Sequence, residues 1–112
     1  MNDDKSRNDM IKGTLDLLIL KVLSLEPLHG WGISERIQDM SRAVLEVNQG
    51  ALYPALHRLV RRGWITSSWA TTENNRRARY YALTAEGRRQ LGAEVVHWQR
   101  LSAAVDRIVA AT

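Results

Sequence analysis

The chain has 112 residues, a formal net charge of +4 and no cysteine. This length predicts one domain with a modest core, so we expect an oligomer in which a partner subunit helps to bury apolar surface. The lack of cysteine excludes disulfides, thiolate catalysis and sulfur-ligated metal sites.

The beginning of the chain predicts an arm followed by a helix. Residues 1–8 carry no hydrophobic periodicity, so we expect a mobile arm there. Residues 9–25 are predicted to form an amphipathic helix, with Ile11, Leu15, Leu18, Val22 and Leu25 on one stripe. Its apolar stretch is too short and too often interrupted by charge to span a bilayer, and no signal peptide is recognisable, so a cytoplasmic protein is expected.

Two further helices are predicted after Pro27. Residues 30–40 (GWGISERIQDM) form the first, with Ile33, Ile37 and Met40 facing inward, and residues 41–46 form an extended or turn link. Asn48 caps the next helix, which ends at Gly63. Its core stripe is expected to contain Leu52, Leu56, Leu59 and Val60.

Pro54 lies inside this third predicted helix and cannot donate a backbone hydrogen bond. The helix is therefore either kinked at Pro54 or begins late enough to leave it in the first turn. We favour a start near Gly50 or Ala51.

Residues 64–70 and 78–83 predict two strands, because aromatic and β-branched side chains dominate both. The polar link between them is long for a tight hairpin, so we expect it to project. Tyr80 and Tyr81 must lie on opposite faces, and packing is the expected role of at least one of them.

The last helix, residues 85–112, begins after the predicted cap Thr84. Apolar residues recur along it at steps of three and four, which indicates a coiled-coil-like seam. The seam consists of Leu91, Val95, Trp98, Leu101, Val105 and Ile108. We expect this seam to form a dimer interface, and the alternative is that the helix folds back onto its own domain.

Positive charge is concentrated in one part of the chain. Between His57 and Arg79 there are six arginines and one acidic residue, a net charge of +5 in a chain of only +4 overall. A basic patch on one helix and one hairpin is typical of a protein that binds a nucleic acid, because each cation placed on a phosphate releases condensed counterions. The alternative is a solvated charged face.

The segments LSLEPLHGWGI, QGALYPALHRLVRRGWI and RRARYYALTAEGRRQL together resemble the PadR family of bacterial transcriptional regulators. The resemblance covers roughly residues 10–111 and is closest to the compact branch with a single C-terminal dimerisation helix. It implies a mainly α fold with a small β-hairpin (α+β). Residues 9–84 would form a winged helix-turn-helix DNA-binding domain and residues 85–112 the dimerisation helix.

The same resemblance implies a homodimer that binds a pseudo-palindromic operator and represses transcription, with a small molecule releasing it in some members. Two-fold symmetry requires the palindrome, and half-sites would lie about one helical turn apart.

Within this framework the helix after Asn48 becomes the recognition helix. Tyr53 suits a phosphate through its hydroxyl group, and Ala51 stands where the family commonly has Ser or Thr, which favours an apolar contact such as a thymine methyl. The other candidates for base contacts are Asn48, Gln49 and His57, although His57 is as readily a solvated residue. Arg58 and Arg61 are assigned to phosphates.

The predicted hairpin becomes the wing. Arg76 and Arg77 are candidates for a narrow minor groove, and Arg79 for a phosphate. Asn75 stands near a position where the family often has glycine, so the tip is expected to depend on Asn75 adopting a left-handed backbone conformation.

Trp98 resembles the tryptophan of the family's multidrug-binding members, whose paired indoles stack on flat aromatic ligands. A symmetric pair of indoles at a dimer seam can leave a slot between them. The expected slot for a small planar aromatic effector is lined by Leu15, Leu18, Val95, Trp98 and Leu101. The alternative is ordinary packing of Trp98 in the seam.

Other functions are less well supported by the sequence. No phosphate loop or nucleophile-base pair indicates an enzyme, so no catalytic residue is assigned. His29, His57 and His97 lie on separate predicted elements, so no metal or other cofactor is expected. The alternative function is a winged helix that serves as a protein-interaction module or an architectural DNA-binding module without an effector.

Overall fold

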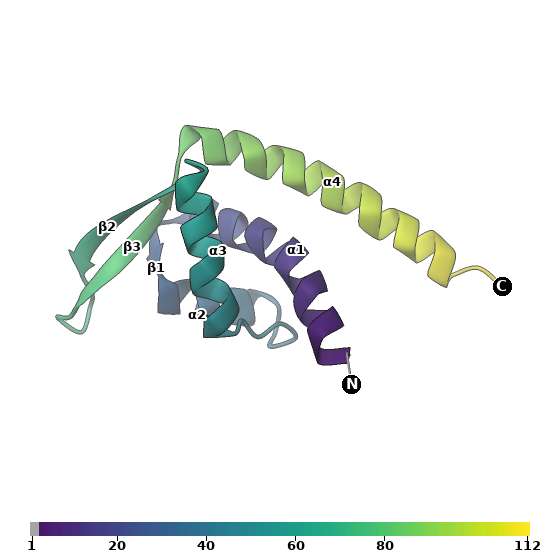
Figure 1. Cartoon of the computed structure of the whole chain (residues 1–112), viewed down its shortest axis with the longest axis horizontal. Coiled ribbons are helices and arrows are strands. Elements are labelled where there is room, and N and C mark those ends of the chain that lie inside the picture. The colour runs from purple at the N-terminus through teal and green to yellow at the C-terminus, as the bar shows by residue number, and fades with distance from the viewer. Residues whose placement is uncertain (1–2) are drawn as a thin grey trace.

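The computed structural model describes residues 3–112, with side chains described from residue 14 onwards. Its elements are α1 (Asp3–Leu25), β1 (Leu28–His29), α2 (Gly30–Met40), α3 (Gln49–Arg61), β2 (Ile65–Thr71), β3 (Arg77–Leu83) and α4 (Ala85–Val109). Helices α1, α2 and α3 pack together beside a small sheet, and α4 extends along α1 and beyond the domain (Figure 1). This is the mainly α winged-helix fold that the sequence predicts.

Helix α1 is longer than predicted. It begins at Asp3 rather than at residue 9, so residues 3–8, which we expected as a mobile arm, are helical. No proline or glycine occurs between residues 3 and 12 to stop the helix, and the lack of hydrophobic periodicity there did not prevent it. Met1 and Asn2 of the expected arm lie outside the described residues.

The core lies where α1, α2, α3 and the sheet meet. Its fully buried large side chains are Leu15, Ile19, Leu20, Ile33, Leu52, Leu56, Leu59 and Ile65. Leu25, Met40 and Val60 were expected inside but are 50%, 54% and 36% exposed. Leu25 and Met40 are the last residues of their helices, and Val60 lies at the edge of the α3 stripe next to buried Leu59.

Helix α3 begins at Gln49, and its cap Asn48 accepts a hydrogen bond from the Gly50 N–H through Oδ1 at 2.6 Å. The late start that we favoured is therefore wrong, because Pro54 lies beyond the first turn. Proline removes the donor that would reach the Gly50 carbonyl, and this cost is small because Gly50 is exposed to water.

The other end of α3 is closed by glycine, as predicted. Gly63 has a φ of +77°. The N–H of Gly63 donates to the Val60 carbonyl, and that of Trp64 donates to the Leu59 carbonyl. This pair of bonds is the Schellman motif, which requires a left-handed residue at this position.

Of the two forms expected for the link at residues 41–46, the structure has a turn at residues 41–43, and residues 45–48 then lead without regular secondary structure to α3. Arg42 and Ala43 both have left-handed backbones, with φ values of 55° and 63°. The Ser41 hydroxyl accepts a hydrogen bond from the Leu45 N–H at 3.0 Å and so braces the turn.

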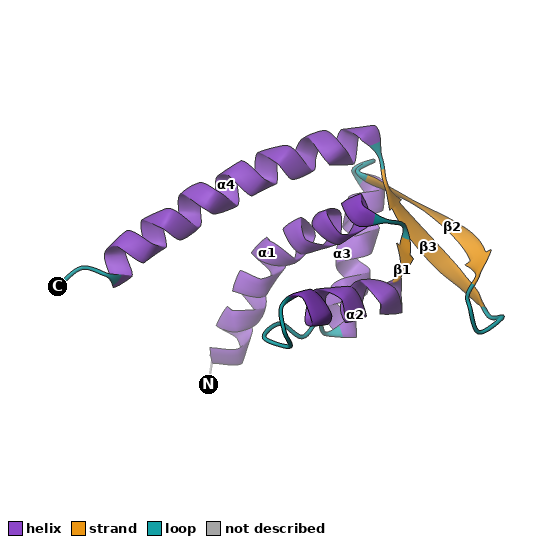
Figure 2. Ribbon diagram, turned by 180° about the vertical axis from the view of Figure 1, so that it is seen from behind, coloured by secondary structure: helices purple, strands orange, loops and turns teal. Residues whose placement is uncertain are grey.

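The sheet is antiparallel with the strand order β1, β3, β2 (orange in Figure 2). Strand β1 has only two residues and was not predicted, because so short a segment carries no periodicity. Pairing of β2 with β3 continues out to Thr71 and Arg77, so the hairpin link is only residues 72–76. The long projecting loop is therefore a tight turn at the end of a projecting two-stranded ribbon.

Helix α4 starts next to the residues that follow α3, because its cap Thr84 is hydrogen-bonded to Gly63 and Trp64. The Thr84 hydroxyl accepts from the Gly87 N–H at 2.9 Å, which confirms the predicted cap, and the Thr84 N–H donates to the Trp64 carbonyl at 3.0 Å. A Cβ atom on Gly87 would lie 1.9 Å from the Trp64 oxygen, so only glycine fits here. Among residues 3–112, no helix combines the length and apolar character needed to cross a membrane.

We predict that Gly87→Ala lowers the free energy of unfolding by about 1–3 kcal/mol, because a backbone oxygen cannot move aside as a side chain can. Gly92→Ala is the matched control on the same helix, where a new Cβ would meet no atom within 4 Å. Helix propensity alone should raise its stability by up to about 1 kcal/mol. Urea unfolding of both variants tests the junction, and a stabilised Gly87→Ala protein would contradict it.

Candidate nucleic-acid interface

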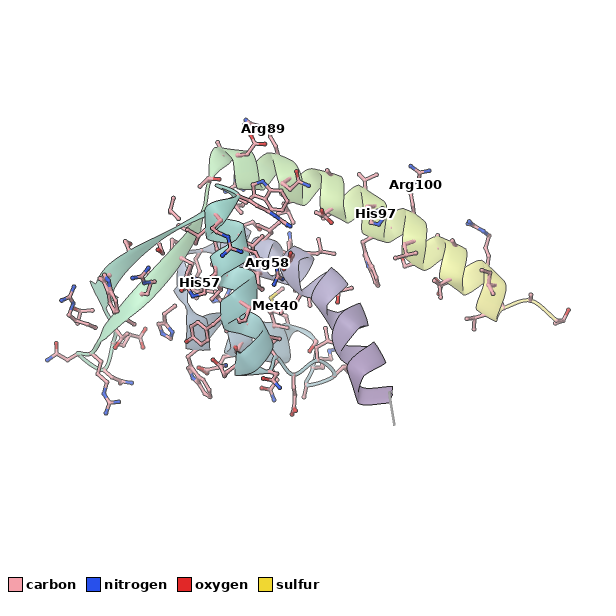
Figure 3. The ribbon with its side chains drawn as sticks, in the orientation of Figure 1. Met40, His57, Arg58, Arg89, His97 and Arg100 are labelled. Carbon is pink, nitrogen blue, oxygen red and sulfur yellow. The ribbon has the colours of Figure 1, made fainter. Side chains whose placement is uncertain are left out.

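An open groove of about 560 Å³ lies between α3 and the β2–β3 hairpin. The side chains that matter for its chemistry are Trp31, Tyr53, His57, Trp69, Arg79 and Tyr81. Figure 3 labels His57 on α3, the helix that faces the hairpin across this groove. The groove therefore joins the predicted recognition helix to the predicted wing, and it exposes aromatic and cationic groups together.

Tyr53 is held across the start of α2. Its hydroxyl oxygen lies 2.7 Å from the position that a Cβ atom would take on Gly30, and its side chain is 44% exposed. Gly30 therefore leaves the space that the phenol ring of Tyr53 occupies, because a Cβ atom there would collide with the ring. The sequence motif HGWG contains this glycine, but sequence reasoning did not connect it with Tyr53.

Tyr81 forms the inner wall of the groove. It is 5% exposed, whereas Tyr80 on the opposite face of β3 packs edge-on against the His29 ring, with centroids 5.3 Å apart. Burial raises the pKa of the Tyr81 hydroxyl above its ordinary value, and the nearby Arg79 charge partly opposes this. Tyr81 is therefore a neutral packing residue.

The arginines of the hairpin lie on and near an exposed tryptophan. The guanidinium carbons of Arg77 and Arg79 lie 5.5 Å and 5.0 Å from the centroid of the Trp69 ring. Arg79 also donates to the Ser67 hydroxyl at 3.2 Å. Arg76 lies at the exposed tip, where its backbone N–H donates to the Thr72 hydroxyl. All three wing arginines are therefore open to solvent.

The tip of the hairpin has the left-handed residue that the sequence predicts. Asn75 has a φ of 60°, and its N–H donates to the Thr72 carbonyl at 3.0 Å. The Thr72 N–H donates in turn to the Arg76 carbonyl at 2.7 Å. This is a three-residue hairpin loop in which asparagine takes the position that glycine usually fills.

At the start of α3, two of the predicted base-contacting residues already have structural partners. The Asn48 side chain caps the helix, and the Gln49 amide donates to the Ser34 hydroxyl of α2 at 3.1 Å. Ala51 is half-buried against the core, whereas His57 and Arg61 are exposed.

Arg58 was predicted to contact a phosphate, but the structure pairs it with α1. Its Nη2 lies 2.9 Å from Oδ1 of Asp16, and Arg62 reaches the other Asp16 oxygen at 3.8 Å. The Arg58 side chain is only 31% exposed. The prediction missed this pair because Asp16 is 42 residues away in sequence, and nothing local links the two helices.

Beyond its first turns, α4 presents an apolar stripe to solvent. Leu91 is buried and Val95 packs at the edge of the core, but Trp98, Leu101, Val105 and Ile108 are 42%, 47%, 48% and 75% exposed. The seam therefore does not fold back completely onto its own domain. Of the α1 residues expected in an effector slot, Leu18 is half-buried, whereas Leu15 is 1% exposed and belongs to the core of the domain.

The three histidines lie on different elements. His29 caps α2 through Nδ1, which accepts from the Gly32 N–H at 3.0 Å, and His57 lies on α3. His97 projects from α4 beside Arg100, away from the hairpin (Figure 3). Within the described part of the chain, no three His, Asp or Glu residues gather as a metal site would require.

Known proteins share this architecture. Residues 19–93 match the model of the transcriptional regulator PadR-like family. A transcriptional regulator from Clostridium thermocellum is 28% identical, with a TM-score of 0.82 over 90% of this chain and 98% of that one. A PadR-like transcriptional regulator from Bacillus cereus is 25% identical, with a TM-score of 0.78 over 93% and 99%. A PadR family regulator from Eggerthella lenta is 26% identical, with a TM-score of 0.78 over 97% and 93%.

We predict opposite effects for two changes at Asn75. Asn75→Ala should lower the free energy of unfolding by about 1 kcal/mol because a Cβ-bearing residue without a polar side chain is strained at positive φ, whereas Asn75→Gly should be neutral or stabilising. Asn74→Ala is the control, since Asn74 shares the turn but has no positive φ. Urea unfolding measures all three, and equal stability of the Ala and Gly variants would contradict the prediction.

Proposed function

The chain belongs to the PadR-like family of transcriptional regulators, and we propose that it is a homodimeric repressor whose α3 and hairpin bind a pseudo-palindromic operator. Members of this family regulate transcription by binding DNA and are not enzymes. The observation that carries the proposal is the groove in which α3 and the arginine-bearing hairpin face each other. In this proposal, residues 9–84 form the DNA-binding domain and residues 85–112 the dimerisation helix.

The exposed groups fit this mode of binding. The start of α3 enters the major groove, where Ala51 meets a base, the Tyr53 hydroxyl meets a phosphate and His57 faces a base edge. Arg61 approaches the phosphate backbone. The hairpin carries Arg76, Arg77 and Arg79 to the adjacent minor groove and its phosphates, where a narrow groove strengthens the negative potential.

Three of the predicted contact residues, Asn48, Gln49 and Arg58, each have a partner within the protein. Asn48 retains its amide hydrogens for DNA while its oxygen caps α3, and Gln49 reaches a base only if it leaves Ser34. Arg58 is withdrawn from the proposed contacts, since Asp16 already neutralises it.

Dimerisation is supported by the exposed stripe on α4. Four large apolar side chains on one helix are a costly surface for a monomer, and pairing with a second α4 or with α1 of a second subunit would bury them. Dimerisation is also typical of the family. A two-fold dimer places its recognition helices on half-sites about one helical turn apart, which is why the operator must be pseudo-palindromic.

We further propose that a small planar aromatic compound bound between the α4 helices releases the operator. The slot is formed by Leu18, Val95, Trp98 and Leu101, and the exposed Trp98 indole supplies its flat wall. The compound acts only if it binds more tightly to the spacing of α3 helices that does not fit DNA, because equal affinity for both spacings shifts no population.

The proposal is tested by selecting bound fragments from a random DNA pool at two salt concentrations. We expect an enriched inverted repeat with half-sites about one turn apart, and an affinity that falls by about 0.9 log unit per neutralised phosphate for each log unit of salt. Enrichment without an inverted repeat would indicate an architectural DNA-binding module. No binding at either salt concentration would favour a protein-interaction winged helix and would overturn the proposal.

Effector binding has its own test. Planar aromatic cations and neutral dyes should quench tryptophan fluorescence of the wild-type dimer, and Trp98→Ala should abolish most of that quenching because the proposed flat wall is lost. Trp31→Ala is the matched control, since it removes an indole far from α4 in sequence and in the fold. Sedimentation must show that both variants remain dimers. Equal quenching in both variants would place the compound elsewhere.

A further inference from the structure

We infer that Trp69 is a positioning residue for DNA binding: its indole holds Arg77 and Arg79 in the conformation in which they meet the phosphates. This inference rests on the proposed function and adds a residue to which sequence reasoning gave no role. It starts from the exposure of Trp69, whose side chain is 56% accessible in the middle of strand β2. A large indole is thus exposed to solvent on an edge strand, and its contacts indicate its role.

The register of the hairpin determines those contacts. Trp69 pairs directly with Arg79, and Arg77 pairs with Thr71 two positions closer to the tip. Because alternate residues of a strand share a face, Trp69, Arg77 and Arg79 all lie on the face that continues inward to Tyr81 and the groove. A single indole therefore lies within reach of both cations, at 5.5 Å and 5.0 Å from the ring centroid.

The chemistry of this contact suits a phosphate partner. A guanidinium group is attracted to the electron-rich face of an indole, and all its N–H donors lie in its own plane. Contact with the ring therefore restricts the arginine side chain without neutralising its charge, which a phosphate can then meet. The Arg79 guanidinium also donates a hydrogen bond to the Ser67 hydroxyl at 3.2 Å, which restricts this side chain further. The two arginine side chains therefore lose less conformational entropy when they bind DNA, because they are already ordered in the free protein.

The contrast with α3 shows why this arrangement is specific to the wing. Arg62 also lies over an indole, 5.1 Å from the Trp64 centroid, but it is shared with the carboxylate of Asp16. Among the described side chains, Arg77 and Arg79 form no ion pair with a carboxylate. Their indole partner fixes their position and leaves their charge available.

The test is a double-mutant cycle on the DNA site recovered by selection. Trp69→Ala should raise the Kd about three- to tenfold in the wild-type background, as expected for two exposed cation–π contacts, and should have no effect in an Arg77→Ala, Arg79→Ala background. The salt slope separates position from charge. It should stay unchanged in Trp69→Ala, because both cations remain, and should fall by about 1.8 in the double arginine variant.

Trp31 provides the matched control. It is an exposed tryptophan of the same groove, 62% accessible, and among the described side chains no arginine lies over its ring. Whatever Trp31→Ala does to the Kd should be the same in both arginine backgrounds. If Trp69→Ala destabilises the hairpin, the variants Trp69→Phe and Trp69→Leu are measured instead. Both keep a large apolar side chain, but only phenylalanine keeps an aromatic face. The Kd of the Trp69→Phe variant should lie within about twofold of the wild-type Kd, and that of the Trp69→Leu variant should be higher.

Two results would overturn the inference. One is a loss of DNA affinity in Trp69→Ala that persists in the double arginine background. It would mean that the indole contacts DNA itself or only supports the hairpin. The other is equal binding by the phenylalanine and leucine variants. Both leave the proposed function intact, whereas a wild-type protein that shows no salt-dependent binding to any inverted repeat would overturn the proposed function and this inference together.

Discussion

The backbone carbonyl of Trp64 is the point on which the geometry of this protein depends. It accepts a hydrogen bond from the Thr84 N–H at 3.0 Å, and it lies so close to Gly87 that no side chain fits between them. The Thr84 hydroxyl, 3.0 Å from this carbonyl, lies nearer to the Gly63 carbonyl, at 2.7 Å. One residue earlier, Gly63 turns the chain out of α3. The end of α3, both ends of the β2–β3 hairpin and the start of α4 are therefore fixed to each other within a few residues.

This junction gives a physical route between the two halves of the proposed mechanism. A change in how two α4 helices pack moves the first turn of α4, and with it the end of α3 and the base of the hairpin, because the Trp64 carbonyl and Gly87 leave little room for independent motion. Asp16 of α1 adds a second connection, since its carboxylate contacts both Arg58 and Arg62 at the end of α3. The proposed effector slot, formed by the α4 helices with Leu18 of α1, would thus lie on elements that are bonded to α3 or to the residues that directly follow it.

What could be predicted from the sequence was local. Asn48, Gly63 and Thr84 were identified because a cap or a left-handed terminus depends on a few neighbouring residues, and the left-handed Asn75 was anticipated in the same way. Contacts between distant segments could not be predicted. Nothing near Arg58 in the sequence indicates that Asp16 pairs with it, and nothing near Gly87 indicates that it faces the Trp64 carbonyl. The role of Trp69 depends on the register of β2 with β3, and strand boundaries alone, which were predicted to within one residue, do not specify which residues pair.

The charge of the basic segment shows why such distant contacts matter for function. Counted along the chain, its six arginines look equivalent. In the fold, a carboxylate neutralises Arg58 and draws Arg62 to the same site, so these residues bind α3 to α1. An indole holds Arg77 and Arg79 and leaves their charge unopposed, while Arg61 and Arg76 stay exposed. The type of partner decides which cations remain available, because an ion pair satisfies the charge and the donors of an arginine, whereas an aromatic face restricts its motion and satisfies neither. A protein can therefore carry a net charge of +4, smaller than the +5 of its basic segment, and still present a concentrated positive surface, provided that acidic residues lie beside the arginines that hold the fold together.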